Sequence, residues 1–367
     1  MNLRKKIGFG AAIIGLFSIT SSASASGSCS AYFYSSYDYC VTTGYCSPYA
    51  SAAEWVAAHP QCFGGSSTTS QAQISGSSFT QINSISSALS GRFGGGNGPA
   101  PKTASTGSQG MAAGNGNNWS VWGNVATNDT RQSYTVAARA VSNNTDILNS
   151  VIGADYTLAP NFVLGVSGAF DRGDSSTQAG ATSVSKGYSI APYLGYQLTK
   201  EFSLDASVGF GAGKLNMAGS TEAESDRLFY AANLSYNRWV DNIQLTGKLG
   251  YLHGEEKYGN TKTNGVTNLN TAAKNKMDRW QLGAQAGYWM SNGVMPYASL
   301  AYLTDRRSTS LVGGANDPIG KSAWQWSLGV NFFSLGSGIT GGIAYLQEEG
   351  RSNQKNDSLM ANINYRF

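Results

Sequence analysis

The clearest pattern in the chain is an alternation of apolar and polar side chains near its C-terminal end. The apolar set within residues 358–367 is Leu359, Ala361, Ile363, Tyr365 and Phe367. Between them lie polar side chains, with Met360 as the single exception. A period of two puts successive side chains on opposite faces of a β-strand, and the segment is about one membrane-crossing strand long. It predicts a strand with lipid on one face and a wet, enclosed interior on the other.

Eleven further segments, beginning at residue 119, repeat this alternation with apolar faces such as Phe202, Leu204, Val208 and Phe210. The intervening positions assigned to the lumen are Asn124, Asp155, Ser167, Gln197, Asp205, Asn233, Lys248, Gln285, Gln325 and Asn331. Twelve strands in series predict an all-β fold, a 12-stranded antiparallel up-and-down transmembrane β-barrel over residues 119–367. A soluble β-sandwich also has alternating strands. It would need one wet face, whereas here the apolar face carries Trp and Tyr and almost no charge.

The predicted connections alternate between short and long. Tight turns are expected near residues 160, 200, 241, 291–293 and 335–336, and long loops over 127–144, 171–184, 214–226, 254–277, 305–322 and 348–356. Short periplasmic turns and longer external loops are typical of outer-membrane barrels, and an even strand count puts both barrel ends on the periplasmic side. A barrel of this size leaves room for a small channel or a single helix.

The N-terminal residues 1–25 predict a secretory signal peptide. A basic start is followed by an apolar run over residues 7–19 and by Ala23-Ser24-Ala25, which gives Ala23 and Ala25 the spacing of a cleavage site. A transmembrane anchor is the alternative, but the apolar run is too short for one.

Residues 26–70 form a short cysteine-rich module and spacer. The module holds all four cysteines of the chain, Cys29, Cys40, Cys46 and Cys62. An even count after a signal peptide favours two disulfides, with three possible pairings, over a metal site, which would be expected to show C-x-x-C spacing. The many tyrosines supply apolar area to a small fold; alternatively, they form an aromatic contact surface.

Residues 71–93 predict a helix with one narrow apolar stripe. Its members are Ile74, Ile82, Ile85 and Leu89, and most other positions are Ser, Gln or Asn. Such a helix is marginal in water, but it is plausible inside a polar lumen, where its side chains can bond the wall. A disordered Ser-rich linker is the alternative. Residues 94–118 are rich in Gly, Asn and Pro and predict a flexible connector.

Composition and motifs give little support to an enzyme. Charged residues make up 13% of the chain, about half the usual share, and the net charge of +4 does not indicate a nucleic-acid partner. The two histidines, His59 and His253, are not accompanied by a G-x-S-x-G motif. The S-x-x-K match at 183–186 lacks its companion motifs, and the glycine-rich segment 209–214 lacks the Ser/Thr of a phosphate loop. The sequence predicts no catalytic residue, no metal and no cofactor.

Taken together, residues 71–367 resemble autotransporters, the type V secretion proteins. The resemblance rests on the leader, the helix before the barrel, the segments WSVWGNV and IGADYTLAPNFVLGVSGAF, and the INYRF ending. It implies export through the general secretion translocon and insertion into the outer-membrane lipid bilayer by the barrel assembly machinery. That machinery would read the C-terminal strand, here Leu359, Ala361, Ile363, Tyr365 and Phe367. It also implies a passenger at the cell surface and a helix left in the pore.

The chain departs from that family in the length of its passenger. Only residues 26–70 separate the expected cleavage site from the helix, whereas family passengers usually have hundreds of residues. Some members cleave themselves between two asparagines in the pore helix; here that helix has only Asn83, so no such cleavage is predicted. Two hypotheses remain: a barrel that displays a small module to an unknown surface ligand, or a narrow pore or structural barrel with a periplasmic module.

Overall fold

The structure, a computed structural model, describes residues 31–58, 74–93, 118–136, 139–177, 182–217, 220–290, 293–309, 319–333 and 339–366. Several predicted features lie outside these ranges. They are the signal peptide with Ala23 and Ala25, Cys29, Cys62, His59, connector residues 94–117 and Phe367.

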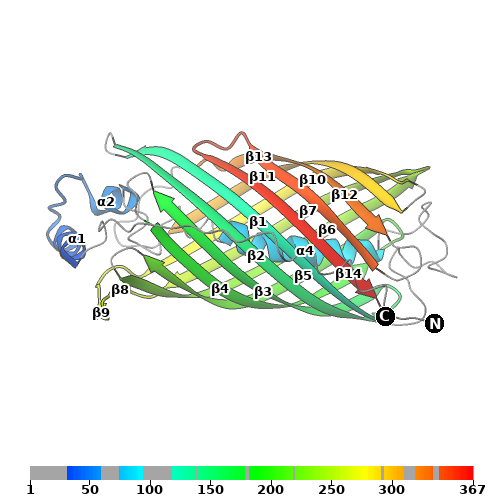
Figure 1. Ribbon diagram of the computed structural model, residues 1–367, viewed down its shortest axis with the longest axis horizontal. Helices are drawn as coiled ribbons and strands as arrows, with labels where there is room; N and C mark the ends of the chain where they lie inside the picture. The colour runs from blue at the N-terminus through cyan, green and yellow to red at the C-terminus, as the bar shows by residue number, and fades with distance from the viewer. Residues whose placement is uncertain are drawn as a thin grey trace, which may run out of the picture.

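Twelve long strands form one closed antiparallel sheet (Figure 1). They are β1 (Trp119–Val136), β2 (Arg139–Ala159), β3 (Phe162–Thr177), β4 (Thr182–Gln197), β5 (Phe202–Met217), β6 (Thr221–Val240), β7 (Ile243–Tyr258), β10 (Ala273–Tyr288), β11 (Val294–Thr309), β12 (Ser322–Phe333), β13 (Ile339–Glu349) and β14 (Gln354–Arg366). Each pairs with its neighbour in the chain. The first and last close the ring through thirteen residue pairs, from Ser120 opposite Arg366 to Gln132 opposite Gln354. The prediction of a 12-stranded up-and-down barrel is confirmed.

The two faces of the wall differ as the alternation predicts. On β3, Leu164, Val166 and Phe170 point outward and are 41 to 65% exposed in the lipid-free structure, whereas the intervening Ser167 and Ala169 are buried. Six of the ten predicted lumen residues, among them Asp155, Asp205 and Asn233, are buried on the inner side, and the other four are partly exposed. The outer wall therefore offers an apolar surface to lipid, and the interior is largely polar.

Four of the six predicted long loops are wrong. The strands continue through residues 127–144, 171–184, 214–226 and 348–356, and leave connections of only two to four residues. In these segments the outer face is largely polar, and the apolar side chains, such as Tyr134, Leu215 and Met217, are buried on the inner side. The apolar outward pattern therefore ends although the backbone pairing continues. Longer connections remain only at 259–272 and 310–321; the first carries the small hairpin β8 (Lys262–Thr263) and β9 (Val266–Thr267).

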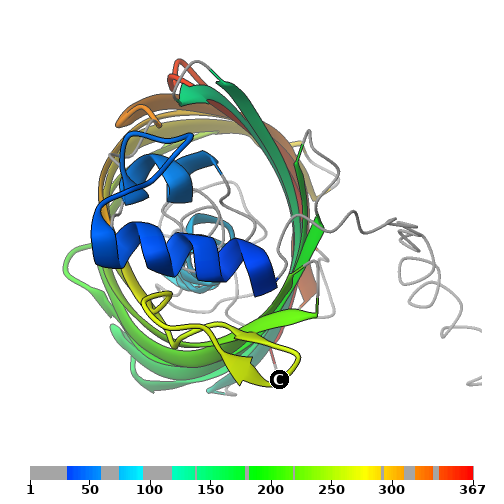
Figure 2. The same ribbon diagram turned by 90° about the vertical axis from the view of Figure 1, so that its left-hand side faces the viewer.

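Two groups of helices precede the barrel. Helices α1 (Ala31–Thr43) and α2 (Ala52–Ala58) lie across one mouth, as the end-on view shows (Figure 2). A single π-helical turn, η2 (Ile74–Ser78), leads into α4 (Phe79–Phe93), which runs along the lumen (Figure 1). The predicted lumen helix is confirmed over residues 74–93. None of the helices in the described part of the chain is long and apolar enough to span a membrane.

Candidate functional site in the barrel lumen

The polar side of α4 is bonded to strands on several sides of the lumen. Gln81 links two of them, because its Nε2 donates to Ser167 Oγ at 3.0 Å and its Oε1 accepts from Ser189 Oγ at 2.7 Å. Its side chain is fully buried. An unpaired amide in that position would cost about 1–3 kcal/mol, so these bonds make a glutamine acceptable in the middle of the barrel.

Asp205 on β5 forms a second anchor for the helix. Its two carboxylate oxygens accept from Ser86 Oγ of α4 at 3.0 Å and from Asn233 Nδ2 of β6 at 2.7 Å. Nearby, Lys248 Nζ donates to Asn83 Oδ1 at 3.3 Å. The Ser84 hydroxyl instead donates within the helix, to the carbonyl of Thr80 at 2.7 Å. The Ser- and Asn-rich composition of α4 therefore matches the wall that surrounds it.

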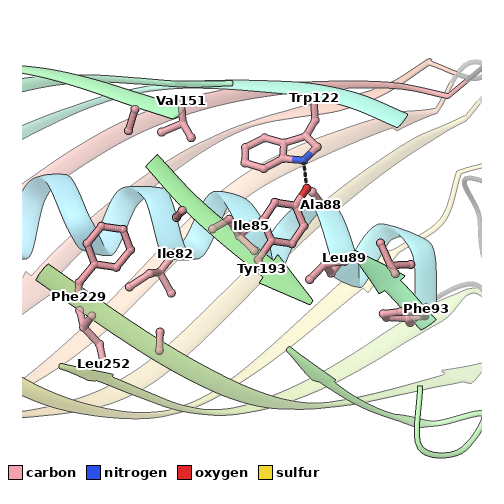
Figure 3. Packing of buried hydrophobic residues seen from close by; sticks show 14 of the residues in the cluster. Ile82, Ile85, Ala88, Leu89, Phe93, Trp122, Val151, Tyr193, Phe229 and Leu252 are labelled. Atoms are coloured by element: carbon pink, nitrogen blue, oxygen red, sulfur yellow. Dashed lines mark hydrogen bonds between the residues drawn. The ribbon is translucent and has the colours of Figure 1, made fainter. Parts of the chain in front are cut away.

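The apolar side of α4 packs into a hydrophobic cluster (Figure 3). Three of the four predicted stripe residues, Ile82, Ile85 and Leu89, are at most 3% exposed. The wall side chains labelled around them in the figure are Trp122, Val151, Tyr193, Phe229 and Leu252. Ile74 lies on η2, where its side chain is outside the described set. Full burial of each large aliphatic side chain contributes about 1.5–3 kcal/mol, so the cluster is a substantial part of what holds the helix in place.

Trp122 and Tyr193 are positioned by a chain of hydrogen bonds. The Trp122 Nε1 donates to Tyr193 Oη at 2.8 Å, and that hydroxyl donates to Asp155 Oδ2 at 2.8 Å (Figure 3). The three residues come from β1, β4 and β2, so the bonds fix large rings across three strands. Buried aromatic groups with polar atoms generally need such partners.

The turn η2 approaches the wall closely at Gly76. A Cβ on this residue would lie 2.7 Å from Ile147 Cδ1 on β2, and the Gly76 carbonyl accepts from Asn149 Nδ2 at 3.2 Å. A larger residue at this position would require the Ile147 side chain to move.

Two groups of buried charges surround the beginning of the helix. In the first, Arg227 on β6 lies 2.5 Å from Asp171 of β3 and 2.8 Å from Glu256 of β7. Asp171 also accepts from Ser77 Oγ of η2 at 2.9 Å. The group therefore ties the helical turn to three strands.

The second group lies on β10, β11, the end of β13 and the connection that follows it; β10 pairs with β7 of the first group. Arg279 makes two bonds of 2.7 and 2.8 Å to Asp305, and its guanidinium lies 4.9 Å from the Phe79 ring centroid of α4. Arg351 bonds Asp305 at 2.9 Å and approaches Glu348 at 3.4 Å. Arg307 also lies 2.7 Å from Asp305, so three arginines face two carboxylates, and all five side chains are buried. Removal of one partner from such a network leaves an uncompensated buried charge.

Sequence reasoning missed both charge groups, although a signal for them exists. Most of their members fall in, or at the edge of, segments that were expected to be external loops. Asp171 and Asp305 each follow the last recognised apolar position at an inward-facing place in the period of two. Extension of that period beyond the apolar band would have placed both carboxylates in the lumen.

The helices α1 and α2 form a small core over the mouth. Tyr37, Tyr49 and Trp55 are buried together with the Cys40–Cys46 disulfide, and Ala273 of β10 belongs to the same cluster. Burial raises the pKa of Tyr37 to about 12. Asn270, in the connection before β10, donates to Asp38 Oδ1 at 2.9 Å. The module is thus docked on the barrel in this structure.

The other predicted residues are placed as follows. Leu359, Ile363 and Tyr365 are outward-facing and 42 to 54% exposed, and Ala361 shares their face. His253 is on the outer wall, where its Nδ1 lies 2.7 Å from Asp278. The described residues include no group of three or more His, Cys, Asp or Glu side chains suited to a metal.

The apolar outer wall and the polar, helix-filled interior define an integral outer-membrane β-barrel. The family model "Autotransporter beta-domain" matches residues 121–345, more than half of the sequence, and the chain belongs to this family. The predicted resemblance and the outer-membrane location are therefore confirmed. Membership implies the general secretion and outer-membrane assembly machinery, and translocator barrels of this kind are in general transport structures rather than enzymes.

Solved structures share the fold at low sequence identity. The translocator domain of the autotransporter NalP from Neisseria meningitidis aligns with a TM-score of 0.62 and 13% identity, over 86% of this chain and 100% of that one. The beta domain of the Bordetella autotransporter BrkA aligns with a TM-score of 0.53 and 16% identity, over 68% of this chain and 100% of that one. The comparison with curated proteins found no match.

Proposed function

We propose that this protein translocates a short disulfide-bonded module through the outer membrane and displays it, anchored by its own barrel, at the cell surface. The division that goes with this proposal is a signal peptide (1–25), a passenger and spacer (26–70), a pore helix (71–93), a connector (94–118) and the barrel (119–367). One observation carries it. Helices α1 and α2 lie at the mouth opposite the end where β14 finishes, and α4 runs between the two ends (Figure 1).

The orientation of the barrel supports an external module. All five connections at the end where β14 finishes have two to five residues, whereas the two longest connections, 259–272 and 310–321, lie at the other end, as external loops do. An even number of strands returns the chain to the side where it began. If that side is periplasmic, the mouth covered by α1 and α2 faces outward.

The contents of the lumen favour display over a solute pore. Gln81, Ile85 and Leu89 are almost fully enclosed by the wall, so the helix occupies the path that a solute would follow. The described part of α4 contains a single asparagine, Asn83, whose amide oxygen is bonded to Lys248. We therefore expect the module to remain covalently attached, so that the mature protein migrates on a denaturing gel as one chain that still carries it.

The test is an epitope inserted between Thr43 and Gly44, both exposed at the end of α1. Intact cells should bind the antibody, and proteinase K should remove the signal. Trypsin is unsuitable, because residues 26–70 contain no Lys or Arg. The matched control carries the same epitope at the exposed Asp241–Asn242 turn of β6–β7, which should become accessible only after the outer membrane is opened.

The two insertions distinguish the hypotheses. Labelling of the module but not of the turn on intact cells supports display. A module that stays protected until the outer membrane is opened would instead support the alternative, a structural barrel or small-solute pore with a periplasmic module.

A further inference from the structure

A hollow in the outer wall collects lysines near one edge of the lipid-facing band. It has a volume of about 620 Å³ and its charged lining residues are Lys186, Lys214, Glu224, Asp226 and Lys257. Tyr188 and Ala212, at outward-facing places of β4 and β5, also line it. The charged side chains lie at outward-facing places of β4, β5, β6 and β7, so the hollow opens away from the lumen.

The position of Lys186 along β4 corresponds to the boundary of the membrane. From Tyr196 to Tyr188 the outward side chains of this strand are uncharged, and Lys186 follows ten residues from Tyr196. A strand rises about 3.4 Å per residue and tilts by about 40°, so these ten residues span roughly 26 Å along the membrane normal. This span is close to the roughly 25 Å height of the apolar band of such barrels. The hollow therefore meets the headgroup region on the side where α1 and α2 lie.

The register places cations side by side in this region. Arg172, Lys186 and Lys214 are directly opposite one another on β3, β4 and β5. Arg172 lies 3.2 Å from Asp174, and Lys214 Nζ lies 2.6 Å from Glu222. Lys186, by contrast, is exposed and has no ion pair or side-chain hydrogen bond within the described part of the chain. Lys257 Nζ lies 3.5 Å from Glu255. Of the three ammonium groups in the lining, that of Lys186 is therefore the one without a carboxylate partner among the described residues.

We infer that this hollow binds the phosphate of a lipid headgroup, with Lys186 and Lys214 as its main contacts. Charge-assisted bonds from ammonium to phosphate are among the stronger hydrogen bonds in proteins, and basic pockets at membrane boundaries accept anionic headgroups. A lipid is favoured over a soluble anion because Tyr188 and Phe210, 60 and 54% exposed, continue the apolar wall directly below the hollow. The acyl chains of a bound lipid would lie along these rings.

The experiment measures lipid binding to the full chain in detergent by native mass spectrometry. The probe is a bis-phosphorylated disaccharide glycolipid, compared with the same glycolipid after removal of both phosphates. The test variant is Lys186→Gln with Lys214→Gln. The control removes two exposed lysines elsewhere, Lys200→Gln at the β4–β5 turn and Lys355→Gln on β14.

We expect the test variant to bind the phosphorylated lipid about tenfold more weakly, as the loss of charge-assisted contacts predicts. The control should bind like the wild type, and the dephosphorylated lipid should bind weakly to all three. Equal binding of both lipids to the wild type, or equal weakening in test variant and control, would overturn the assignment. Full competition by inorganic phosphate at the lipid concentration would assign the site to a soluble anion instead and would also refute it.

A second double variant should change lipid binding in the opposite direction, and it therefore distinguishes an effect on binding from an effect on folding. Glu224→Gln with Asp226→Asn removes the two carboxylates of the lining and should strengthen binding of the phosphorylated lipid. Weaker binding by this variant would refute the proposal. The measurement uses purified protein, so its outcome is independent of whether the N-terminal module is displayed.

Discussion

Shortening of the most enclosed side chains of α4 should open the lumen. Ile85 and Leu89 are 0 and 1% exposed and pack among wall residues that include Trp122 and Tyr193. We consider the double change Ile85→Ala with Leu89→Ala, which leaves every polar bond between helix and wall in place.

The expected size of the effect follows from the loss of buried carbon atoms. Substitution of a buried Ile or Leu by Ala costs about 2–5 kcal/mol. With the lower figure for each site, the helix-in-lumen state loses about 4 kcal/mol, a factor on the order of 10³ in the ratio of open to closed barrels. Because the polar bonds remain, we expect transient opening rather than permanent loss of the helix.

Single-channel recording in planar bilayers measures this ratio directly. The wild type should be closed for nearly all of the record, and the double variant should show frequent openings. Ser87→Ala is the matched control, because Ser87 is the exposed residue in the middle of the same helix. Heat-dependent gel mobility verifies that each barrel is folded.

Two results would refute the reasoning. A folded double variant that stays closed as long as the wild type would mean that the hydrophobic cluster does not retain the helix. Equal opening by Ser87→Ala would mean that any change in α4 disturbs it.

Three further predictions concern the charge groups and the module. Asp305→Ala should lower the free energy of unfolding by about 3–5 kcal/mol, because it leaves the buried Arg279, Arg307 and Arg351 with Glu348 as their remaining buried carboxylate; denaturant titration against the exposed Lys321→Ala measures the difference, and equal values would contradict it. Non-reducing peptide mapping should pair Cys29 with Cys62, since the other two cysteines are bonded, and a peptide with either thiol free would contradict it. The neutral phenol of Tyr37 is favoured in the folded module, so the stability that it contributes should be lost as pH rises from about 10 to about 12; Tyr37→Phe should remove this alkaline loss, measured by helical circular dichroism, and an unchanged profile would argue against it.

The barrel could be predicted from the sequence because the membrane imposes a simple rule on it. Within the apolar band every second side chain must suit lipid, so strands such as β3 and β14 can be read directly from the period of two. Outside that band the rule no longer applies. The extensions of β1 to Val136 and of β6 back to Thr221 have polar side chains on the outer face, and it is the backbone pairing that shows them to be strands.

The contacts of the lumen helix were less accessible to sequence reasoning. The stripe of Ile82, Ile85 and Leu89 is local and can be recognised by its spacing. The partners of Gln81 are 86 and 108 residues away, and their identity depends on the rotation of the helix against the wall. The hydrophobic periodicity of the sequence does not determine that rotation. The cysteine count likewise predicted two disulfides but not their pairing. Cys40 and Cys46 lie on either side of the end of α1 at Thr43, and the sequence did not predict this helix.

The pairing of β1 with β14 also limits the order of assembly. These strands are the first and last of the wall, so the enclosure is completed only when the C-terminal strand arrives. Until then the sheet has two unpaired edge strands, whose free backbone groups can pair with other chains. The thirteen-pair seam is therefore both the final step of closure and the place where a truncated chain would remain open to aggregation.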